Sequence, residues 1–225
     1  MEKLKQNHFQ KAIMNKLHIL QHIFCRLVIT IFLIQSISAE KILFRADSMT
    51  GNTGDATSKA TLLGNANITT ETMEIFADKI ELSGDNYRYV KATGNVSGSN
   101  NEKKIDFTCG ELLYDRKNKY ATMQESVHLV DKKNETVANA ELMDYDENHD
   151  TVVMQISVAM QQKDNICSSS YAIYNTESRL LFLSGNPQLT QGKDTFRAQD
   201  ITLNLDTNEV TLDGRVRGTV SSKDN

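Results

Sequence analysis

Tryptophan is absent from this chain of 225 residues, and proline occurs once, at Pro187. Threonine, valine, isoleucine, asparagine and aspartate are frequent instead. β-Branched residues favour strands, and Asn and Asp favour polar turns. The composition is therefore more typical of strands joined by polar turns than of helices, and the length allows one or two ordinary domains.

A long apolar run at the N-terminus is also missing. The uncharged run Leu27–Ile34 is much shorter than the about 20 residues that a membrane-spanning helix needs. Five basic residues precede it, and small and polar residues follow it up to Ala39. This order is typical of a secretory signal. We therefore expect residues 1–39 to be a signal peptide and residues 40–225 to be the exported domain, with a retained membrane anchor as the alternative.

Positive charge is scarce in the predicted exported domain. Without residues 1–39, the 25 basic and 29 acidic residues of the chain become 20 and 28, a net charge of −8. Nucleic-acid binding needs a basic face, so we expect no nucleic acid as a partner. An anionic lipid held locally by Lys or Arg remains compatible with this charge.

Residues suited to catalysis are few. After residue 39 the histidines are His128 and His149, and no serine or cysteine lies in a nucleophile elbow. The acidic segment 144–155 resembles a calcium loop, but His149 and Gln155 stand where that loop needs Gly and Glu. The other carboxylates are scattered over predicted turns, which are usually solvated. We expect no enzymatic activity, no metal site and no cofactor.

An internal repeat of about 30 residues is the most informative feature. Gly-Asn occurs at 64–65, 94–95 and 185–186, and Gly214 continues the series, with the glycines 30, 91 and 29 residues apart. The two positions that would complete the series fall near Gln124 and Gln155, within similar apolar stretches.

A second landmark has the same period. An aromatic residue or leucine followed by Asp or Asn occurs at Tyr114, Tyr145, Tyr174 and Leu205, with spacings of 31, 29 and 31 residues. A polar turn follows each, and Asp and Asn suit turns because their side chains bond nearby backbone amides. Two landmarks with one period indicate true repeats. An ordinary β-sandwich with evenly spaced strands is the alternative interpretation.

Apolar and polar residues alternate between the landmarks, as they do in half-buried strands. The alternation slips by one residue within 77–80, 109–112 and 198–201. Strand side chains have a period of two, so a three-residue step indicates a bulge or a corner. We predict an all-β fold of stacked antiparallel bent hairpins, in which two facing sheets enclose an apolar interior.

One set of side chains would point into this interior if the strands share a register. Each member could simply be a core residue, and only the whole set is a candidate lipid-binding surface. The strands that begin at the glycine landmarks contribute Ile68, Val96, Val127, Leu129, Val158, Met160, Leu189 and Val216, and the second strands contribute Ile75, Phe107 and Phe196.

The repeated motifs resemble those of the OstA-like family. The shared features are the Gly-Asn strand starts, the Tyr-Asp turns, the Ala-Asp-Lys-Ile segment at 77–80 and the opening Phe-Arg-Ala-Asp-Ser at 44–48. Together they cover roughly residues 41–220. The missing Gly-Asn pairs near Gln124 and Gln155 depart from the family pattern, as do the two cysteines of the exported domain.

The resemblance implies a twisted β-jellyroll, open at both ends, whose interior holds the acyl chains of lipopolysaccharide or a similar lipid in the periplasm. It also implies end-to-end association, with itself and with jellyroll domains of inner- and outer-membrane transport proteins. Open sheet edges pair readily with other edges. Each buried methylene yields about 0.8 kcal/mol, so walls that leave a channel between them could bind a lipid firmly.

Two alternatives remain open at this point. One is a structural or adhesive exported β-repeat protein with a packed core and no lipid ligand. The other is a family member that residues 27–38 anchor in the inner membrane.

The cysteines of the exported domain are Cys109 and Cys167. An oxidising compartment would allow them to pair. They lie 58 residues apart, close to two repeats. Two layers of about 4.8 Å place their backbones roughly 9–10 Å apart, beyond the about 7 Å that a disulfide tolerates. We therefore expect both thiols to stay unpaired.

Overall fold

The computed structural model describes residues 41–52 and 58–221, so the predicted signal peptide lies outside the described residues. These residues form one antiparallel sheet of 16 strands with a short 3-10 helix, η1 (Asp85–Tyr87). Within them, no helix has the length and apolar character needed to cross a membrane. The prediction of an all-β fold of stacked hairpins is confirmed.

The central strands are long, and each pairs with the next through a short turn. They are β3 (Lys59–Thr69), β4 (Met73–Ser83), β5 (Tyr89–Asn100), β6 (Ile105–Asp115), β7 (Tyr120–Asp131), β8 (Thr136–Asp146), β9 (Thr151–Gln162) and β10 (Asn165–Asn175). The strands at the two ends are shorter. They are β1 (Leu43–Arg45), β2 (Ser48–Asn52), β11 (Leu180–Ser184), β12 (Gln188–Gln191), β13 (Asp194–Arg197), β14 (Asp200–Asn204), β15 (Val210–Asp213) and β16 (Arg217–Thr219).

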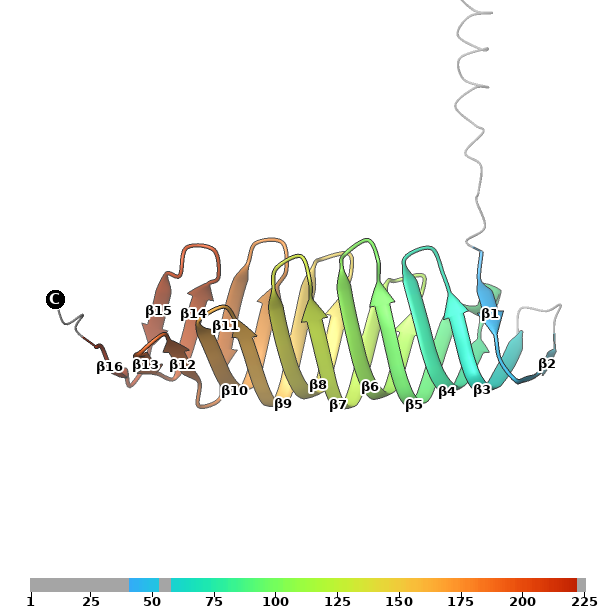
Figure 1. Cartoon of the computed structure of the whole chain (residues 1–225), viewed down its shortest axis with the longest axis horizontal. Helices are drawn as coiled ribbons and strands as arrows, with labels where there is room; N and C mark the ends of the chain where they lie inside the picture. Colours follow the sequence, from blue (N-terminus) through green and yellow to red (C-terminus); the bar gives the residue numbers. More distant parts are fainter. Residues whose placement is uncertain (1–40, 53–57, 222–225) are drawn as a thin grey trace, which may run out of the picture. The chain divides into compact units, whose positions relative to one another are not determined.

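The strands stack in chain order along one axis, from β1 and β2 to β15 and β16 (Figure 1). Every long strand bends midway, so the sheet folds into two walls with their apolar faces toward each other. We call the turns of each wall, together with the strand ends beside them, its rim. The first rim contains the turns 84–88, 116–119, 147–150, 176–179 and 205–209. The second rim contains the turns 70–72, 101–104, 132–135, 163–164 and 192–193.

In β3, β5, β7 and β9 the bend is a corner of two consecutive residues with positive φ. In β3 these are Gly64 and Asn65, with φ of 74° and 46°. Asn65 Nδ2 donates a hydrogen bond to Asp47 Oδ2 at 2.9 Å, and one repeat later Asn95 makes the same bond to Asp78 at 2.8 Å. Left-handed backbone favours Gly and tolerates Asn, which is why this pair recurs at the strand midpoints.

The two corners that lack Gly-Asn keep this geometry. Residues 125–126 have φ of 69° and 56°, and residues 156–157 have φ of 65° and 55°. The two corners predicted near Gln124 and Gln155 therefore begin one residue later, at Glu125 and Ile156. Gly110 on the neighbouring strand faces Glu125, and a Cβ at Gly110 would lie 2.7 Å from the Cβ of Glu125. In this repeat, the space at the corner is provided by a glycine on the other strand.

The predicted slips in the alternation are also confirmed. The β4–β5 register shifts between Phe76 and Lys79, and the β6–β7 register shifts between Thr108 and Glu111. The third slip coincides with the break between β13 and β14.

Ile156 is the most strained of the corner residues, because it is β-branched, has a φ of 65° and is 59% exposed. Left-handed backbone costs an L residue roughly 1–2 kcal/mol. Ile156→Gly should therefore raise the free energy of unfolding by about 1 kcal/mol in urea denaturation. Ile166→Gly is the control, because Ile166 is 53% exposed but lies in ordinary strand backbone. That change should lower stability by about 0.5–1 kcal/mol. Equal losses in both variants would contradict the assignment of strain.

The turns after the Tyr-Asp landmarks form as predicted at three positions. The Oδ1 atoms of Asp115, Asp146 and Asn175 each accept hydrogen bonds from the amides two and three residues later. Asp146 plays this role within the segment that resembles a calcium loop. The fourth turn differs, because Asn204 accepts these bonds one residue before the predicted landmark. The side chain of Asp206 instead faces Arg179, with Nε 3.1 Å from Oδ1.

Candidate lipid-binding interior

The predicted inward residues lie where the two walls face each other, and most are fully buried. The exposed fractions are 0% for Ile68, Ile75 and Leu189, 1% for Val96, Val127 and Leu129, 2% for Val158, 3% for Met160 and 5% for Phe107. Phe196 is half-buried and packs against the same core. Their burial is established, whereas their role in lipid binding stays a prediction.

Val216 is the exception, because it is 53% exposed. It lies between β15 and β16, and the β16 ladder begins only at Arg217, which pairs with Arg197 of β13. No further strand packs beyond β16 in the described sheet. The prediction that Val216 points into the interior is therefore wrong.

The first wall supplies the other half of the interior, which the predicted set missed. All predicted residues lie on the second wall. The facing side chains of the first wall are 0–1% exposed and include Leu62, Ile80, Leu112, Met123, Met143, Met154, Leu181, Leu183 and Ile201. The alternation at Ile80 and Leu82 was a usable signal for them, because residues beyond the slip return to the inner face.

Two of the predicted aromatic residues cover glycines on neighbouring strands. Phe107 pairs directly with Gly98, where an added Cβ would lie 2.8 Å from Phe107 Cε1 and 2.9 Å from the Glu74 carbonyl oxygen. Phe196 pairs with Gly218, where a Cβ would lie 3.1 Å from Phe196 Cδ1. Glycine inside a strand often marks such a close approach. The alternation pattern could not reveal these contacts, because they depend on the register between strands.

The walls fill the space between them with their own side chains, so the expected channel differs from what the structure contains. Met123, Met143, Met154, Met160 and Tyr174 are each 0–3% exposed. Methionine adapts to irregular gaps, and long side chains from both walls meet in the middle. A lipid chain could enter this closed interior only if the walls moved apart.

Polar contacts join the two rims across the open side of the bend. Each pairs a residue of the second rim with a residue of the first rim that follows it by 42 to 47 positions. They are Lys103 Nζ to Asp150 Oδ1 at 2.8 Å, Lys133 Nζ to Glu177 Oε2 at 3.6 Å, Asn134 Nδ2 to the Thr176 carbonyl oxygen at 3.1 Å, and Asn165 Nδ2 to Asn208 Oδ1 at 3.0 Å.

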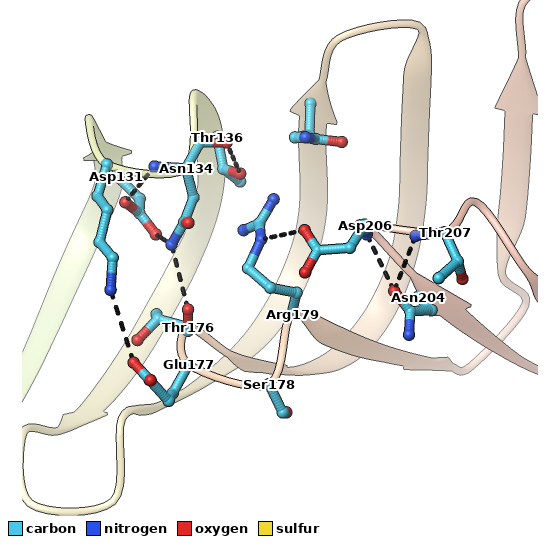
Figure 2. A network of polar contacts seen from close by, with 12 residues as sticks. Asp131, Asn134, Thr136, Thr176, Glu177, Ser178, Arg179, Asn204, Asp206 and Thr207 are labelled. Carbon is cyan, nitrogen blue, oxygen red and sulfur yellow. Dashed lines mark hydrogen bonds and ion pairs between the residues drawn. The ribbon is translucent and has the colours of Figure 1, made fainter.

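A fifth and more buried contact of this kind joins Asp131 to Tyr174. Figure 2 shows Asp131 beside Asn134, whose side chain reaches Thr176 of the first rim. Tyr174 Oη donates to Asp131 Oδ2 at 3.2 Å, and Arg179 Nη1 donates to Tyr174 Oη. Burial, helped by the charge of Asp131, raises the pKa of Tyr174 to about 12. The hydroxyl therefore stays protonated near neutral pH and remains a donor to the carboxylate.

Sequence analysis misses these rim residues, because carboxylates in turns are expected to be solvated. Asp131 is 1% exposed, Glu147 4% and Arg179 7%. Asp131 contacts the opposite rim at Tyr174, whereas Glu147 and Arg179 face Lys119 and Asp206 of neighbouring turns, and no local pattern reports these contacts. The recurrence of Asp and Asn at the repeat spacing is the one sequence signal for such buried polar residues. The same recurrence is expected of solvated turns, so it does not distinguish the two.

Both cysteines are buried and unpaired, as predicted. The predicted separation is wrong, however, because each repeat contributes two strands. Cys109 lies on β6 and Cys167 on β10, with β7, β8 and β9 between them. Four strand spacings correspond to about 19 Å. Burial raises the pKa of each thiol to about 12.

A cavity of about 570 Å³ lies along the first rim of β3 to β7, away from the predicted residues. Outward-facing side chains such as Tyr89, Leu113 and Tyr120 line it. Two of the charged groups in its lining have ionic partners, since Lys91 Nζ lies 2.7 Å from Glu111 and Asp115 is bonded to Arg88. Its lining also includes Ala60, Leu82, Val90 and Tyr114 of the apolar core, so the cavity lies against the first wall.

The folded sheet and its enclosed apolar interior define an elongated β-jellyroll. A family model described as LptA/(LptD N-terminal domain) LPS transport protein matches residues 45–180, more than half of the chain. The chain belongs to this family of lipopolysaccharide transport proteins, which confirms the resemblance that the sequence motifs indicate.

One similar solved structure is that of LptH from Pseudomonas aeruginosa, described as the LptA homologous periplasmic component of the conserved lipopolysaccharide transport device. It is 14% identical, the match covers 81% of this chain and 96% of that chain, and the TM-score is 0.25. Comparison with curated proteins gives no match.

Proposed function

We propose that this chain is a periplasmic carrier of lipopolysaccharide or a similar lipid, with acyl chains lying between the two walls. The observation that carries the proposal is the continuous apolar interior, which runs through neighbouring strands from β3 to β14. Buried polar side chains such as Asn100, Asp131 and Asn165 lie at the strand ends beside the turns. Membership of a lipopolysaccharide transport family supports the same ligand.

The fold has a means of making room for such a ligand. The backbone ladders run between neighbouring strands within each wall, and the two walls are continuous only through the corners. Separating the walls therefore leaves these ladders in place and breaks side-chain contacts. Acyl chains would then replace the lost apolar contacts, at about 0.8 kcal/mol for each buried methylene.

The two ends of the stack support end-to-end association. At one end, Leu43, Phe44 and Met49 of β1 and β2 are 42–54% exposed, and these strands pair on one side with β3. At the other end, Val216 and Val220 are 53% and 72% exposed beside β16. Unpaired strand edges are ready templates for another strand. The partners would be further copies of this chain and jellyroll domains of inner- and outer-membrane transport proteins.

A structural or adhesive role is the second candidate, and the filled interior favours it. In that case the packed side chains would serve only stability, and the ends or the surface would carry the function.

Photo-reactive leucine, incorporated in place of leucine, separates the two roles without altering side-chain shape greatly. The protein would be isolated from the periplasm of cells that make lipopolysaccharide, irradiated and analysed by mass spectrometry. We expect lipid adducts at Leu112 and Leu129, which are 0% and 1% exposed on the inner faces. Leu113 is the matched control, because it neighbours Leu112 but is 40% exposed on the outer face.

Two results would contradict the carrier proposal. One is the complete absence of lipid from the periplasmic protein in native mass spectrometry. The other is adduct formation at Leu113 with none at Leu112 or Leu129, which would place the lipid on the outer surface. The same mass spectra would report whether residues 1–39 have been removed and whether oligomers form.

A further inference from the structure

We propose that the contacts between the rims form a clasp that holds the interior shut, and that the clasp must open before a lipid can enter. The clasp consists of the contacts Lys103–Asp150, Asp131–Tyr174, Lys133–Glu177, Asn134–Thr176 and Asn165–Asn208. The closure is a property of the protein alone. Only its link to lipid entry rests on the proposed function.

The position of the clasp makes it the barrier to the interior. The corners close one side of the folded sheet, and the clasp spans the opposite side along several successive turns. Beneath it, Leu129, Met160 and Leu181 are 0–3% exposed. Polar contacts suit a reversible closure, because donors and acceptors that separate at a rim can bond to water instead.

The strength of the clasp is concentrated at Tyr174. This hydroxyl bridges Asp131 on the second rim and Arg179 on the first, and hydrogen bonds to charged groups are stronger than neutral ones. The preceding repeat has the same positions without the same bonds. Asn100 Nδ2 and Tyr145 Oη, which precede Asp131 and Tyr174 by 31 and 29 residues, are buried and have no hydrogen-bond partner among the described residues.

The chain therefore contains its own matched control. Tyr174→Phe removes a bridging hydroxyl, whereas Tyr145→Phe removes an unpartnered one from an equally buried tyrosine of the same wall. Both changes keep the aromatic ring and remove one oxygen atom. A difference between the variants thus reports the clasp contact and not the loss of packing.

Cys167 reports opening without any lipid. Its side chain is 2% exposed on the inner face of β10, and its raised pKa makes the closed state unreactive. In a Cys109→Ala background, labelling of Cys167 at pH 8 by a small thiol reagent should be about tenfold faster in Tyr174→Phe than in the parent, the factor expected for losing a hydrogen bond to a charged group. Tyr145→Phe should label at the parent rate.

Urea denaturation of each variant separates local opening from global unfolding. Labelling of Tyr174→Phe that is faster than its global unfolding equilibrium allows, together with the faster rate relative to the parent, supports the clasp. Labelling no faster than global unfolding allows overturns it. If Tyr174→Phe does not fold, Lys103→Met replaces it in this comparison of labelling rate and global stability. Lys103→Met breaks the partly exposed ion pair of the clasp with Asp150.

A covalent bridge across the rims tests the link to lipid entry. Asn134→Cys and Thr176→Cys, in a background of Cys109→Ala and Cys167→Ala, would be joined by a cleavable bismaleimide. Purified rough lipopolysaccharide is the probe, and native mass spectrometry measures its capture. We expect the bridge to slow capture at least about tenfold, and cleavage to restore it, because the rims separate only when these contacts are broken together. Capture at the unbridged rate would overturn this proposal.

The two proposals fail in different ways. If the unbridged protein captures no lipopolysaccharide while Cys167 labelling still distinguishes the tyrosine variants, the carrier function fails and the closure stands. If lipid is captured but neither labelling nor bridging has an effect, the carrier function stands and the clasp is overturned.

Discussion

Phe107→Ala is expected to lower the free energy of unfolding by about 3–5 kcal/mol. Phe107 is 5% exposed, and its ring covers Gly98 on the neighbouring strand. Its removal leaves a cavity that a glycine cannot fill, so the loss should lie toward the upper end of that range. Urea denaturation followed by circular dichroism measures it. Phe76→Ala is the control, because Phe76 is 46% exposed on the outer face, and should cost less than about 1 kcal/mol.

A double-mutant cycle tests whether Gly98 accounts for part of this sensitivity. Gly98→Ala should destabilise the protein by itself, because its Cβ would overlap the ring of Phe107. In a Phe107→Ala background the same change should cost clearly less, since the ring is gone and only the contact with the Glu74 carbonyl remains. Purely additive losses would show that the ring and the glycine act independently.

Asp131→Ala is expected to lower the free energy of unfolding by about 3 kcal/mol, because buried donors left without an acceptor cost about 1–3 kcal/mol each. The carboxylate accepts from the Asn134 amide at 3.0 Å, from Asn134 Nδ2 at 2.6 Å and from Tyr174 Oη. Chemical denaturation of the variant measures the loss.

Asp146→Ala is the control for Asp131→Ala. Asp146 also accepts hydrogen bonds from turn amides, but its side chain is 29% exposed, so water can replace it. That variant should lose less than about 1 kcal/mol. Similar losses in both would mean that the Asp131 contact across the rims contributes nothing beyond an ordinary turn.

The repeat, the bend and the strand alternation could be predicted from the sequence because each has a local cause. Left-handed backbone at the corners selects Gly-Asn, as at residues 64–65, and a turn selects Asp or Asn, as at Asp115. The slips at 77–80 and 109–112 follow from the same corners. Most of the second-wall interior follows too, because every second residue after a corner faces inward, as Val127 and Leu129 do.

The remaining features depend on relations between strands that are distant in the chain. The distance between Cys109 and Cys167 is larger than predicted, because the sequence period gives the number of residues in a repeat but not the number of strands. Each repeat contains two strands, so the two cysteines are four strand spacings apart. The burial of Asp131 depends on a rim 43 residues later. The filled interior depends on how far the walls approach, which the alternation of one strand does not determine. Val216 was misplaced because the stack ends at β16.

The corner geometry also determines how this molecule can vary in length. After two consecutive antiparallel strands the chain is again at the same rim and runs in the same direction. Every hairpin of the stack therefore begins and ends at corresponding positions of the cross-section. Insertion or loss of one 30-residue unit would join identical junctions and change the length of the stack by about 10 Å. Evolution can therefore change the length of such a protein in fixed increments, while the cross-section stays constant.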